Sequence, residues 1–325
     1  MAQSPTGTLP RVLPRILLRH EAILALLLVL ALVVLGLNND RFFTTANLLN
    51  QGRLMTEVGL IAVVMTFVII TGGIDLSVGS IFGLSAILLG VFWKTLGLPL
   101  PVAMLTAVAV GGVAGLVNGL IITRFLVPPL IATLATLALY RGLAEGISKA
   151  QSIRGYPEWF FVLGQGDLAG VPTQLWLLAV MALAGIFILG FTAFGRTTYA
   201  IGNNEAAASF SGLAVERTKL VIYTVSGLVS GLAAVVFVSR VSTTRSDMGT
   251  GIELDVITAV VLGGTSIFGG RGSVIGTLLG LVLIQVLKNG LALSGVKGDG
   301  TIVIIGVVLI LAVLVSNFLS RFSKS

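Results

Sequence analysis

The 325-residue chain is 56% hydrophobic and only 10% charged, and its mean hydropathy is +1.06. A soluble domain is about a quarter charged, so this composition excludes a water-soluble globular protein and indicates that lipid is the solvent. The net charge of +7 comes from Lys and Arg residues scattered over predicted helix ends and loops, where they meet lipid headgroups; this scatter argues against nucleic-acid binding.

Cysteine and histidine usage removes several classes of chemistry. The chain has no cysteine, which excludes disulfides, thiolate metal sites and a cysteine nucleophile. Its single histidine, His20, lies at the end of the N-terminal tail, so a haem, a metal site or an intramembrane Ser–His protease would lack an imidazole in the bundle. We therefore predict no metal site, no catalytic residues and no enzymatic activity on this chain.

Residues 1–19 form a polar, basic tail that contains proline, and we predict that it is disordered and cytoplasmic. Residues 20–325 then form a transmembrane domain, in which apolar runs of bilayer-crossing length recur. The first run follows three arginines and lacks a small-x-small cleavage site, so we read it as a retained helix. Basic residues near both ends favour two cytoplasmic termini. An all-α polytopic bundle of ten transmembrane helices is predicted, at roughly residues 21–37, 54–71, 76–93, 101–122, 127–148, 174–193, 218–239, 254–268, 273–291 and 300–320.

Two connections between the predicted helices are long. With the termini in the cytoplasm, residues 149–173 face the outside, and they include an aromatic cluster between Tyr156 and Phe161. The cluster fits an aromatic belt at the membrane interface, which is the commoner arrangement, or a docking site for a partner. Residues 194–217 face the cytoplasm.

Glycines spaced by four predict close helix packing. In lipid no hydrophobic force drives helices together, and a helical face without side chains lets two backbones approach. We read the spacing as a packing signal rather than as a ligand site. The spaced glycines are Gly111, Gly115 and Gly119, then Gly227 and Gly231, then Gly276 and Gly280.

A glycine pattern occurs twice. The segment Gly72–Gly83 (GGIDLSVGSIFG) resembles Gly263–Gly276 (GGTSIFGGRGSVIG), because each begins with two glycines and ends in G-S-x-x-G. Both copies lie between consecutive hydrophobic spans. Matching glycine-interrupted segments in two halves are typical of transporters, where the breaks often border the substrate path.

Asp75 is an acid at or near membrane depth, between a glycine pair and an apolar run. It fits an N-terminal cap for the following helix, accepting backbone N–H groups that have no partner inside the helix. It also fits a broken helix that lines a pathway, because an ionisable residue inside a bundle is a functional candidate. The two interpretations are compatible.

The segment Glu253–Thr277 carries the glycine-rich turn around Arg271. It does not match the phosphate-loop pattern G-x-x-x-x-G-K-[ST], so we do not expect this chain to bind a nucleotide. We expect the turn to join two helices, with Arg271 at the cytoplasmic headgroups.

The cytoplasmic loop predicts a short helix outside the membrane. Gly202, Asn203 and Asn204 form a predicted turn, and residues 205–210 are helix formers with an acid in the first turn, ending before Gly212. Such a helix is either a solvated connector or an insert for the groove of a partner.

Further polar residues lie in or near the predicted spans. Four of them could line a translocation path together with Asp75, since hydroxyls, amides and an aromatic ring suit hydrogen bonding to a sugar; such groups also hold helices together. These four are Asn118, Thr133, Thr136 and Tyr140. Arg141 and Glu145 are expected to pair along their helix. Glu57 begins the second predicted helix.

The motifs together resemble a known family. The four segments GGIDLSVGS, NGLIITRFLVPPLIATLATLALYRG, AIGNNEAAASFSGLAVERTK and ELDVITAVVLGGTSIFGGRGSVIGT are similar to the permease subunit of ribose-type ABC importers, and the resemblance extends over about residues 21–320. It implies a ten-helix fold like that of vitamin-B12-type permeases, in a bacterial inner membrane. It further implies two permease copies around the pathway, a cytoplasmic ABC ATPase that binds ATP and Mg²⁺, and a periplasmic sugar-binding protein.

The resemblance also assigns a coupling helix that enters the ATPase. The residues carried over are Gly202, Asn203, Asn204, Glu205, Ala206, Ala207 and Gly212. In the wider permease class Glu-Ala-Ala is followed by three residues and then Gly, whereas four residues separate Ala207 from Gly212 here.

Other details narrow the resemblance and leave one alternative function. The segments LGQGDLAGVP and SRVSTTRSDMGTGIELDVITAVVLGGTSIFGG look most like those of rhamnose and autoinducer-2 permeases, and ribose, xylose and other monosaccharides stay open. The alternative is an ion-coupled secondary sugar transporter, which would usually need buried acids as ion ligands. Only Asp75 and Glu57 qualify.

Overall fold

The structure, a computed structural model, describes residues 20–149 and 151–296 and the isolated positions 298, 300, 303, 306 and 307. The predicted tail at 1–19 lies outside the described residues, as does most of the helix predicted at 300–320.

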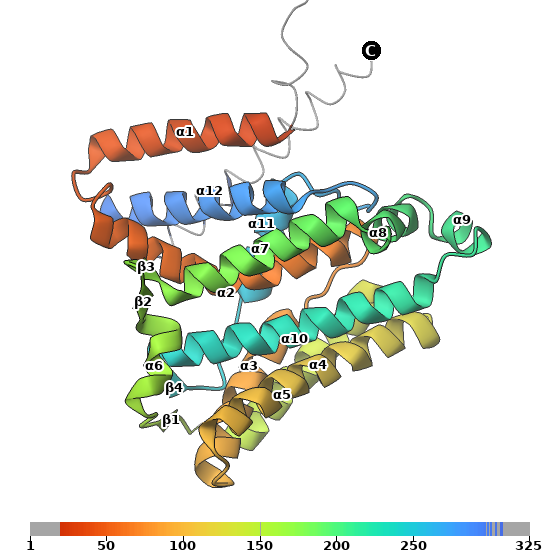
Figure 1. The fold of residues 1–325 in the computed structure, drawn as a ribbon, viewed down its shortest axis with the longest axis horizontal. Coiled ribbons are helices and arrows are strands. Elements are labelled where there is room, and N and C mark those ends of the chain that lie inside the picture. The colour runs from red at the N-terminus through yellow and green to blue at the C-terminus, as the bar shows by residue number, and fades with distance from the viewer. Residues whose placement is uncertain are drawn as a thin grey trace, which may run out of the picture.

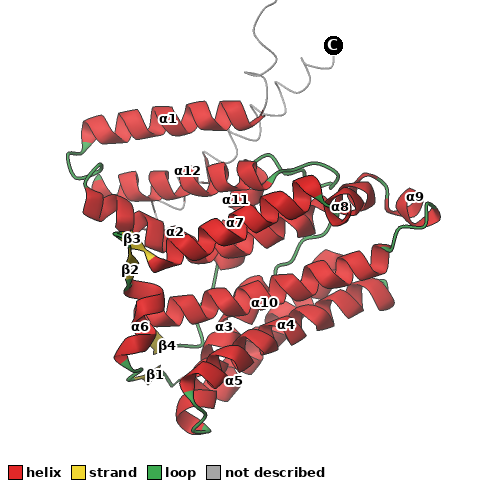
Figure 2. Cartoon of the chain, viewed as in Figure 1, coloured by secondary structure: helices red, strands yellow, loops and turns green. Residues whose placement is uncertain are grey.

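The described chain is almost entirely helical, which confirms an all-α polytopic membrane protein (Figure 2). Eight of its helices are long and apolar enough to cross a membrane. Counting the π-helical segment η1 (Val91–Thr95) with α3, they are α1 (His20–Asn38), α2 (Thr45–Ile70), α3 (Val78–Gly90), α4 (Leu100–Arg124), α5 (Pro129–Ser148), α7 (Thr173–Phe191), α10 (Val215–Val241) and α12 (Val274–Leu293).

Shorter elements gather at the ends of the bundle or interrupt it. The short helices are α6 (Glu158–Gln165), α8 (Ala193–Asn203), α9 (Glu205–Phe210) and α11 (Ile252–Leu262). Two antiparallel strand pairs join β1 (Ile153–Arg154) to β4 (Thr243–Thr244) and β2 (Asp167–Leu168) to β3 (Val171–Pro172). Figure 1 shows α8 and α9 at one end of the bundle, which we call the α9 end. Helix α6 and the strands lie at the opposite end, which we call the strand end.

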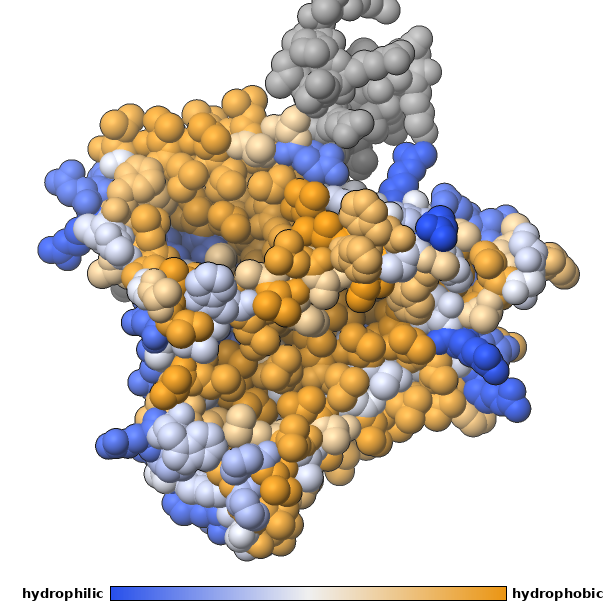
Figure 3. Space-filling model, viewed as in Figure 1, coloured by the Kyte–Doolittle hydropathy of each residue, from blue (hydrophilic) through white to orange (hydrophobic). Residues whose placement is uncertain are grey.

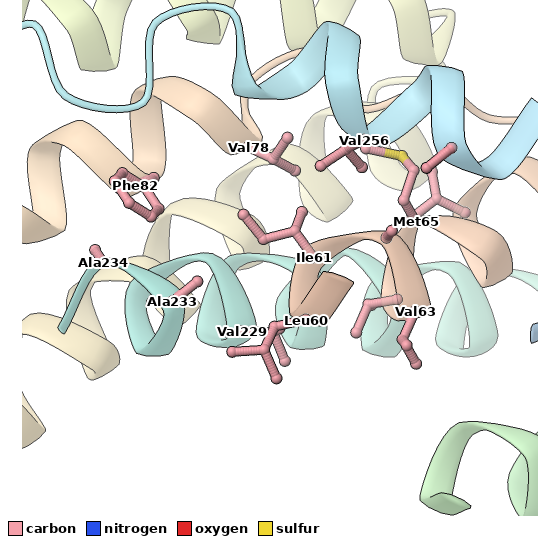
Figure 4. Packing of buried hydrophobic residues seen from close by; sticks show 14 of the residues in the cluster. Leu60, Ile61, Val63, Met65, Val78, Phe82, Val229, Ala233, Ala234 and Val256 are labelled. Atoms are coloured by element: carbon pink, nitrogen blue, oxygen red, sulfur yellow. The ribbon is translucent and has the colours of Figure 1, made fainter. Parts of the chain in front are cut away.

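Helix α2 is the centre of the core. Its side chains Leu60, Ile61 and Met65 are at most 1% exposed. Figure 4 shows them packed among residues of three other helices, α3, α10 and α11. Helix α1, in contrast, packs against α12, and only 6% of its apolar window is buried. The buried share of each helix therefore distinguishes α2, at the centre of the bundle, from α1, which faces lipid.

The spaced glycines pack as predicted. A Cβ added to Gly111 would collide with the Gly227 carbonyl, and one added to Gly115 would collide with the Tyr223 carbonyl, so α4 and α10 touch along their backbones. Similarly, Gly276 lies against Gly263, at the contact between α12 and the end of α11. The absence of side chains at these glycines therefore lets α4 pack directly against α10, and α12 against the end of α11.

The space-filling view separates apolar from polar surface. On the face in Figure 3, hydrophobic residues cover most of the helix sides and hydrophilic residues gather at the two ends. Hydrophilic atoms also lie at the floor of a hollow between α12 and α7 (Figure 3).

The predicted span at 254–268 is wrong in length. Helix α11 has 11 residues and is about 17 Å long, roughly half the hydrocarbon thickness. It ends at Gly263, and Gly264 has a left-handed φ of +90°. Apolar residues continue past this glycine pair, so hydropathy alone extended the helix.

Three local predictions also differ. Helix α2 begins nine residues before the predicted start at 54, because the Thr44 side chain caps it by accepting from the Asn47 N–H. The connection 149–173 contains α6, and its Tyr156 and Phe160 side chains are buried in the core rather than displayed. Instead of pairing with Glu145, the Arg141 guanidinium donates to backbone carbonyls of other elements.

Candidate functional site: the Asp75 network and the α9 end

The break between α2 and α3 is built around a buried carboxylate. Gly72 turns the chain out of α2 with a φ of +78°. Asp75 Oδ1 then accepts from the Ser77 N–H at 3.0 Å and from Ser77 Oγ at 2.6 Å. Its Oδ2 accepts from Ser226 Oγ of α10 at 3.1 Å. Asp75 is 0% exposed, so these three donors replace the water that a carboxylate would otherwise bind.

The network continues through the predicted path residues. Asn118 Nδ2 donates to Ser77 Oγ at 2.7 Å. The Tyr140 hydroxyl donates to the Ala114 carbonyl, on the same helix as Asn118, at 3.0 Å and lies 3.4 Å from Asn118 Oδ1. From α5, Thr133 Oγ1 donates to the Ile74 carbonyl at 3.0 Å. The structure thus brings Asp75, Asn118, Thr133 and Tyr140 together at one break, although three different segments supply them.

Thr136 lies beside this network rather than in it. Its hydroxyl donates to the Thr133 carbonyl one turn earlier on α5, at 3.3 Å. All five predicted path residues are at most 5% exposed. In this conformation they hold the broken helix to α4, α5 and α10, and Asp75 accepts a backbone N–H just before α3, close to its predicted capping role.

Three members of this region were not singled out from the sequence. Ser77 and Ser226 bind the carboxylate directly, and the buried Tyr223 hydroxyl has no hydrogen-bond partner in the described part of the chain. For Ser226 the only available signal was a serine beside a glycine in an apolar helix, and its partner Asp75 is 151 residues away in the sequence.

The second buried acid is neutralised by a cation. Glu57 of α2 is 2% exposed, and its Oε1 accepts from Arg240 Nε of α10 at 2.8 Å. The Arg240 guanidinium also lies 4.9 Å from the centre of the Phe237 ring. A buried pair with this geometry fastens α2 to α10, because removing either partner leaves an uncompensated charge.

Helix α9 forms as predicted and is displayed at the end of the bundle (Figure 1). Asn204 caps it by accepting from the Ala207 N–H at 2.9 Å, and Glu205 pairs with Lys219 of α10 at 2.6 Å. Gly212, two residues after the last residue of α9, turns the chain with a left-handed φ of +79°. Ala206 and Ala207 are exposed, as is Phe210 at 93%.

The predicted turn at 202–204 is shorter than expected. Gly202 and Asn203 belong to the last turn of α8, and the helical path breaks only at Asn204, where φ is −161°. Asn203 Nδ2 donates to the Tyr199 carbonyl inside α8 at 2.9 Å. The residues carried over to the coupling helix are therefore divided between two helices.

Helix α8 contacts both glycine-rich breaks. A Cβ on Gly202 would collide with the Ile70 carbonyl and with Gly270 N, and these two atoms are themselves hydrogen-bonded at 2.9 Å. The Tyr199 hydroxyl donates to the Gly272 carbonyl at 2.7 Å. Burial and the nearby Glu21 carboxylate raise the pKa of Tyr199, which keeps the hydroxyl protonated as a donor. The two similar glycine segments meet each other here, directly beside the helix that leads into α9.

The described residues contain no group of three or more Asp, Glu or His side chains placed to hold a metal ion.

Residues 47–313 match the family model described as the branched-chain amino acid transport system / permease component. The ribose import permease protein of Escherichia coli strain K12 is 39% identical over 312 residues, covering 93% of this chain and 94% of the relative. That of Bacillus subtilis strain 168 is 41% identical over 292 residues, with 89% and 90% covered.

A third relative has a different named cargo. The autoinducer 2 import system permease protein of Escherichia coli O9:H4 is 37% identical over 300 residues, covering 90% of this chain and 91% of the relative. No solved structure matched.

Proposed function

The chain belongs to the family of branched-chain amino acid transport system permease components, and from this premise we propose that it is the membrane subunit of an ABC importer for a monosaccharide. Sequence identities of 37–41% over about nine tenths of the chain to ribose and autoinducer-2 import permeases support a sugar-like cargo over an amino acid. Rhamnose stays a prediction from sequence details.

One observation supports this role more than any other: a short, rigidly attached helix that displays a phenylalanine outside the spans. Phe210 is 93% exposed on α9, and the helix is anchored by its Asn204 cap and by the Glu205–Lys219 pair. An aromatic side chain on a fixed, exposed helix is what a groove in a partner protein recognises. In this proposal that partner is the ATPase.

The proposed coupling route runs from α9 through α8 to the two breaks. Gly202 leaves no room between α8, the end of α2 and the Gly270 turn, so a displacement of α8 displaces Ile70. Ile70 lies five residues before Asp75, whose network ties the break to three further helices. ATP-driven closure of the ATPase would thereby move helices on both sides of the break and alternate access to the cargo.

The remaining components follow from this role. ATP and Mg²⁺ would be held by the ATPase, because this chain lacks a phosphate-loop motif. A second permease copy or a homologue would complete the pathway, and a sugar-binding protein would deliver cargo to the strand end. The α9 end and both termini would then face the cytoplasm of a bacterial cell.

The first test is a purification. The tagged chain, extracted gently from native membranes, should bring down an ABC ATPase in stoichiometric amounts, and liposomes containing the assembly should take up sugar only with ATP. A chain that purifies alone and carries sugar without ATP would contradict the proposal.

The second test is a substitution at the exposed helix. Phe210→Asp should abolish ATP-dependent uptake and ATPase co-purification while leaving the permease folded. Phe125→Ala serves as the control, since Phe125 is 73% exposed just after α4 and outside α9. Unchanged transport in a Glu205→Arg, Gly212→Trp double variant would also reject the coupling role of α9.

The ion-coupled transporter is a weaker candidate on this geometry. It needs a buried acid that is free to bind an ion, and the two acids noted in the sequence are not free, since Glu57 is paired with Arg240 and Asp75 has three donors. Among the described residues, Glu253 Oε2 is buried without a hydrogen-bond partner. Asp75→Asn tests this directly: a gradient-driven carrier would lose its dependence on the coupling ion, whereas an ATP-driven importer has no such dependence to lose.

A further inference from the structure

A row of polar side chains runs along α2, α11 and α12, away from the Asp75 network. Its members form three contacts between helices: Asn47 with Asn289 at 2.9 Å, Gln51 with Gln285 at 2.7 Å, and Lys288 with Asp255 at 2.8 Å. We call this set the polar row. It contains four neutral amides and one ion pair of zero net charge.

The polar row begins at the ends of α2 and α12, where Asn47 and Asn289 lie, and continues inward along both helices. Lys288 follows the start of α12 by 14 residues, which is a rise of about 21 Å, and Gln285 by a rise of about 17 Å. Helix α12 is itself about 30 Å long, the thickness of the hydrocarbon core, so Lys288 starts about 8 Å and Gln285 about 12 Å from its C-terminal end. Asp255 has the same depth, because it pairs with Lys288.

The chain reaches Asp255 by a non-helical route along α3. The Met248 carbonyl lies against Gly83 and the Gly249 carbonyl lies against Gly79, so this backbone descends beside α3 before α11 begins. Arg141 donates to the carbonyls of Ser246 and Met248, at 2.7 and 2.8 Å. Irregular backbone at membrane depth occurs only where protein buries it or where it lines a water-filled cavity.

Exposure distinguishes the polar row from the Asp75 network. The Lys288 and Asp255 side chains are 33% and 41% exposed, whereas Asp75 and Asn118 are 0% exposed. A half-exposed ion pair facing hydrocarbon is costly, so the open side of the row must meet water, cargo or protein. The exposed charges of the ion pair therefore exclude lipid tails as the neighbour of the row.

The row offers donors and acceptors without a net charge. Each amide both donates and accepts, and the Asp255–Lys288 pair adds an acceptor and a donor whose charges cancel. An anion or a cation gains nothing from such a surface overall. A neutral polyol can exchange hydrogen bonds with it one after another, without being held firmly.

We propose that the polar row contacts the sugar on its way through the membrane, and that the Asp75 network does not. This inference rests on the proposed function, and it assigns the sugar-contacting surface to Asn47, Gln51, Asp255, Gln285, Lys288 and Asn289. The Asp75 network is instead the positioning element of the broken helix.

Accessibility provides a test that does not depend on transport. Because the chain has no cysteine, single cysteines can be introduced into it without background reaction. A membrane-impermeant, charged thiol reagent should label Gln285→Cys in liposomes, and ribose should slow the labelling. Asn118→Cys in the buried network and Leu183→Cys on the exposed side of α7 should stay unlabelled. An unreactive Gln285→Cys in every state would overturn the proposal.

Transport kinetics provide the second test. In liposomes containing the permease, its ATPase and its binding protein, Gln285→Leu and Asp255→Asn should each raise the apparent KM for sugar about tenfold, the effect of one lost hydrogen bond. Asp40→Asn, the same acid-to-amide change in the exposed turn after α1, should leave KM unchanged.

The outcomes separate the two proposals. A normal KM in both variants, together with reduced thermal stability, would show that the polar row only holds helices together. Loss of the association between two permease copies would show that the row is a subunit interface. Either result overturns the inference. A wild-type assembly that hydrolyses ATP without moving any sugar would overturn the proposed function as well.

Discussion

The two glycine-rich breaks share a sequence pattern but are stabilised in opposite ways. At the first break, residues 71–77, an internal carboxylate organises the chain, and Asp75 and Ser77 have no exposed surface. At the second, residues 263–273, backbone contacts organise the chain, and four of its glycines adopt positive φ angles. There the side chain of Phe268 is 86% exposed. The positions of the glycines therefore determine where a helix breaks. The residues between them determine whether the side chains at the break are buried or exposed.

The largest expected effect is at Gly202, where α8 packs against both glycine-rich breaks. Gly202→Ala places a Cβ against the Ile70 carbonyl and Gly270 N, which are backbone atoms and cannot move aside cheaply. We expect it to lower the free energy of unfolding by about 3 kcal/mol or more, at the upper end of overpacking costs, and to abolish uptake. Thermal aggregation in detergent measures the first effect. Gly142→Ala, in open space on α5, is the control and should be neutral.

The next effect sharpens the role of the first break. Asp75→Ala leaves three buried donors around a small cavity, and we expect a loss of about 3 kcal/mol in stability. Asp75→Asn keeps the shape and one acceptor, so it should cost less. If both variants melted like the wild type, Asp75 would not be the element that organises the break.

A smaller effect isolates backbone strain. Gly72 has a φ of +78° and ample space around its Cα. Gly72→Ala should therefore cost about 1–2 kcal/mol from the left-handed conformation alone. Gly72→Asn should cost less, because asparagine tolerates this region better than alanine. Equal melting temperatures for the two variants would argue against strain as the cause.

The smallest effect tests the link from α8 to the second break. Tyr199→Phe removes the hydrogen bond to the Gly272 carbonyl, worth about 1 kcal/mol. The permease should stay folded. If α8 passes motion to this break, sugar uptake per ATP hydrolysed should fall, whereas a merely structural tyrosine would lower stability and leave this ratio unchanged.

Much of the fold could be predicted because lipid imposes simple rules on sequence. Apart from the start of α2, apolar runs located the eight candidate spans to within a few residues, and glycines spaced by four located the contact between α4 and α10. The half-length α11 was missed because hydropathy does not register a turn at Gly263 inside an apolar run. Helix α6 was missed because its eight residues lie in a connection that was treated as a loop.

The candidate site was predictable as a set of residues but not as an arrangement. Asp75, Asn118, Thr133 and Tyr140 were each conspicuous as polar groups in apolar surroundings. Ser226 was not, since its importance comes from a carboxylate 151 residues away. Rules for neighbours along one helix likewise paired Arg141 with Glu145, although two of its acceptors lie more than 100 residues further on and the third lies 62 residues earlier.

The acceptors of Arg141 also bear on how the protein is made. Helix α5 has the lowest mean hydropathy of the eight candidate spans, at 1.3, and an arginine near a helix centre raises the free energy of insertion by about 2.5–3.5 kcal/mol. One carbonyl that offsets this cost, that of Gly79, is already present, but the two at shorter distances belong to Ser246 and Met248, which the ribosome supplies about 100 residues later. During synthesis α5 is therefore a poorly committed membrane segment, and the second half of the chain completes the insertion of the first.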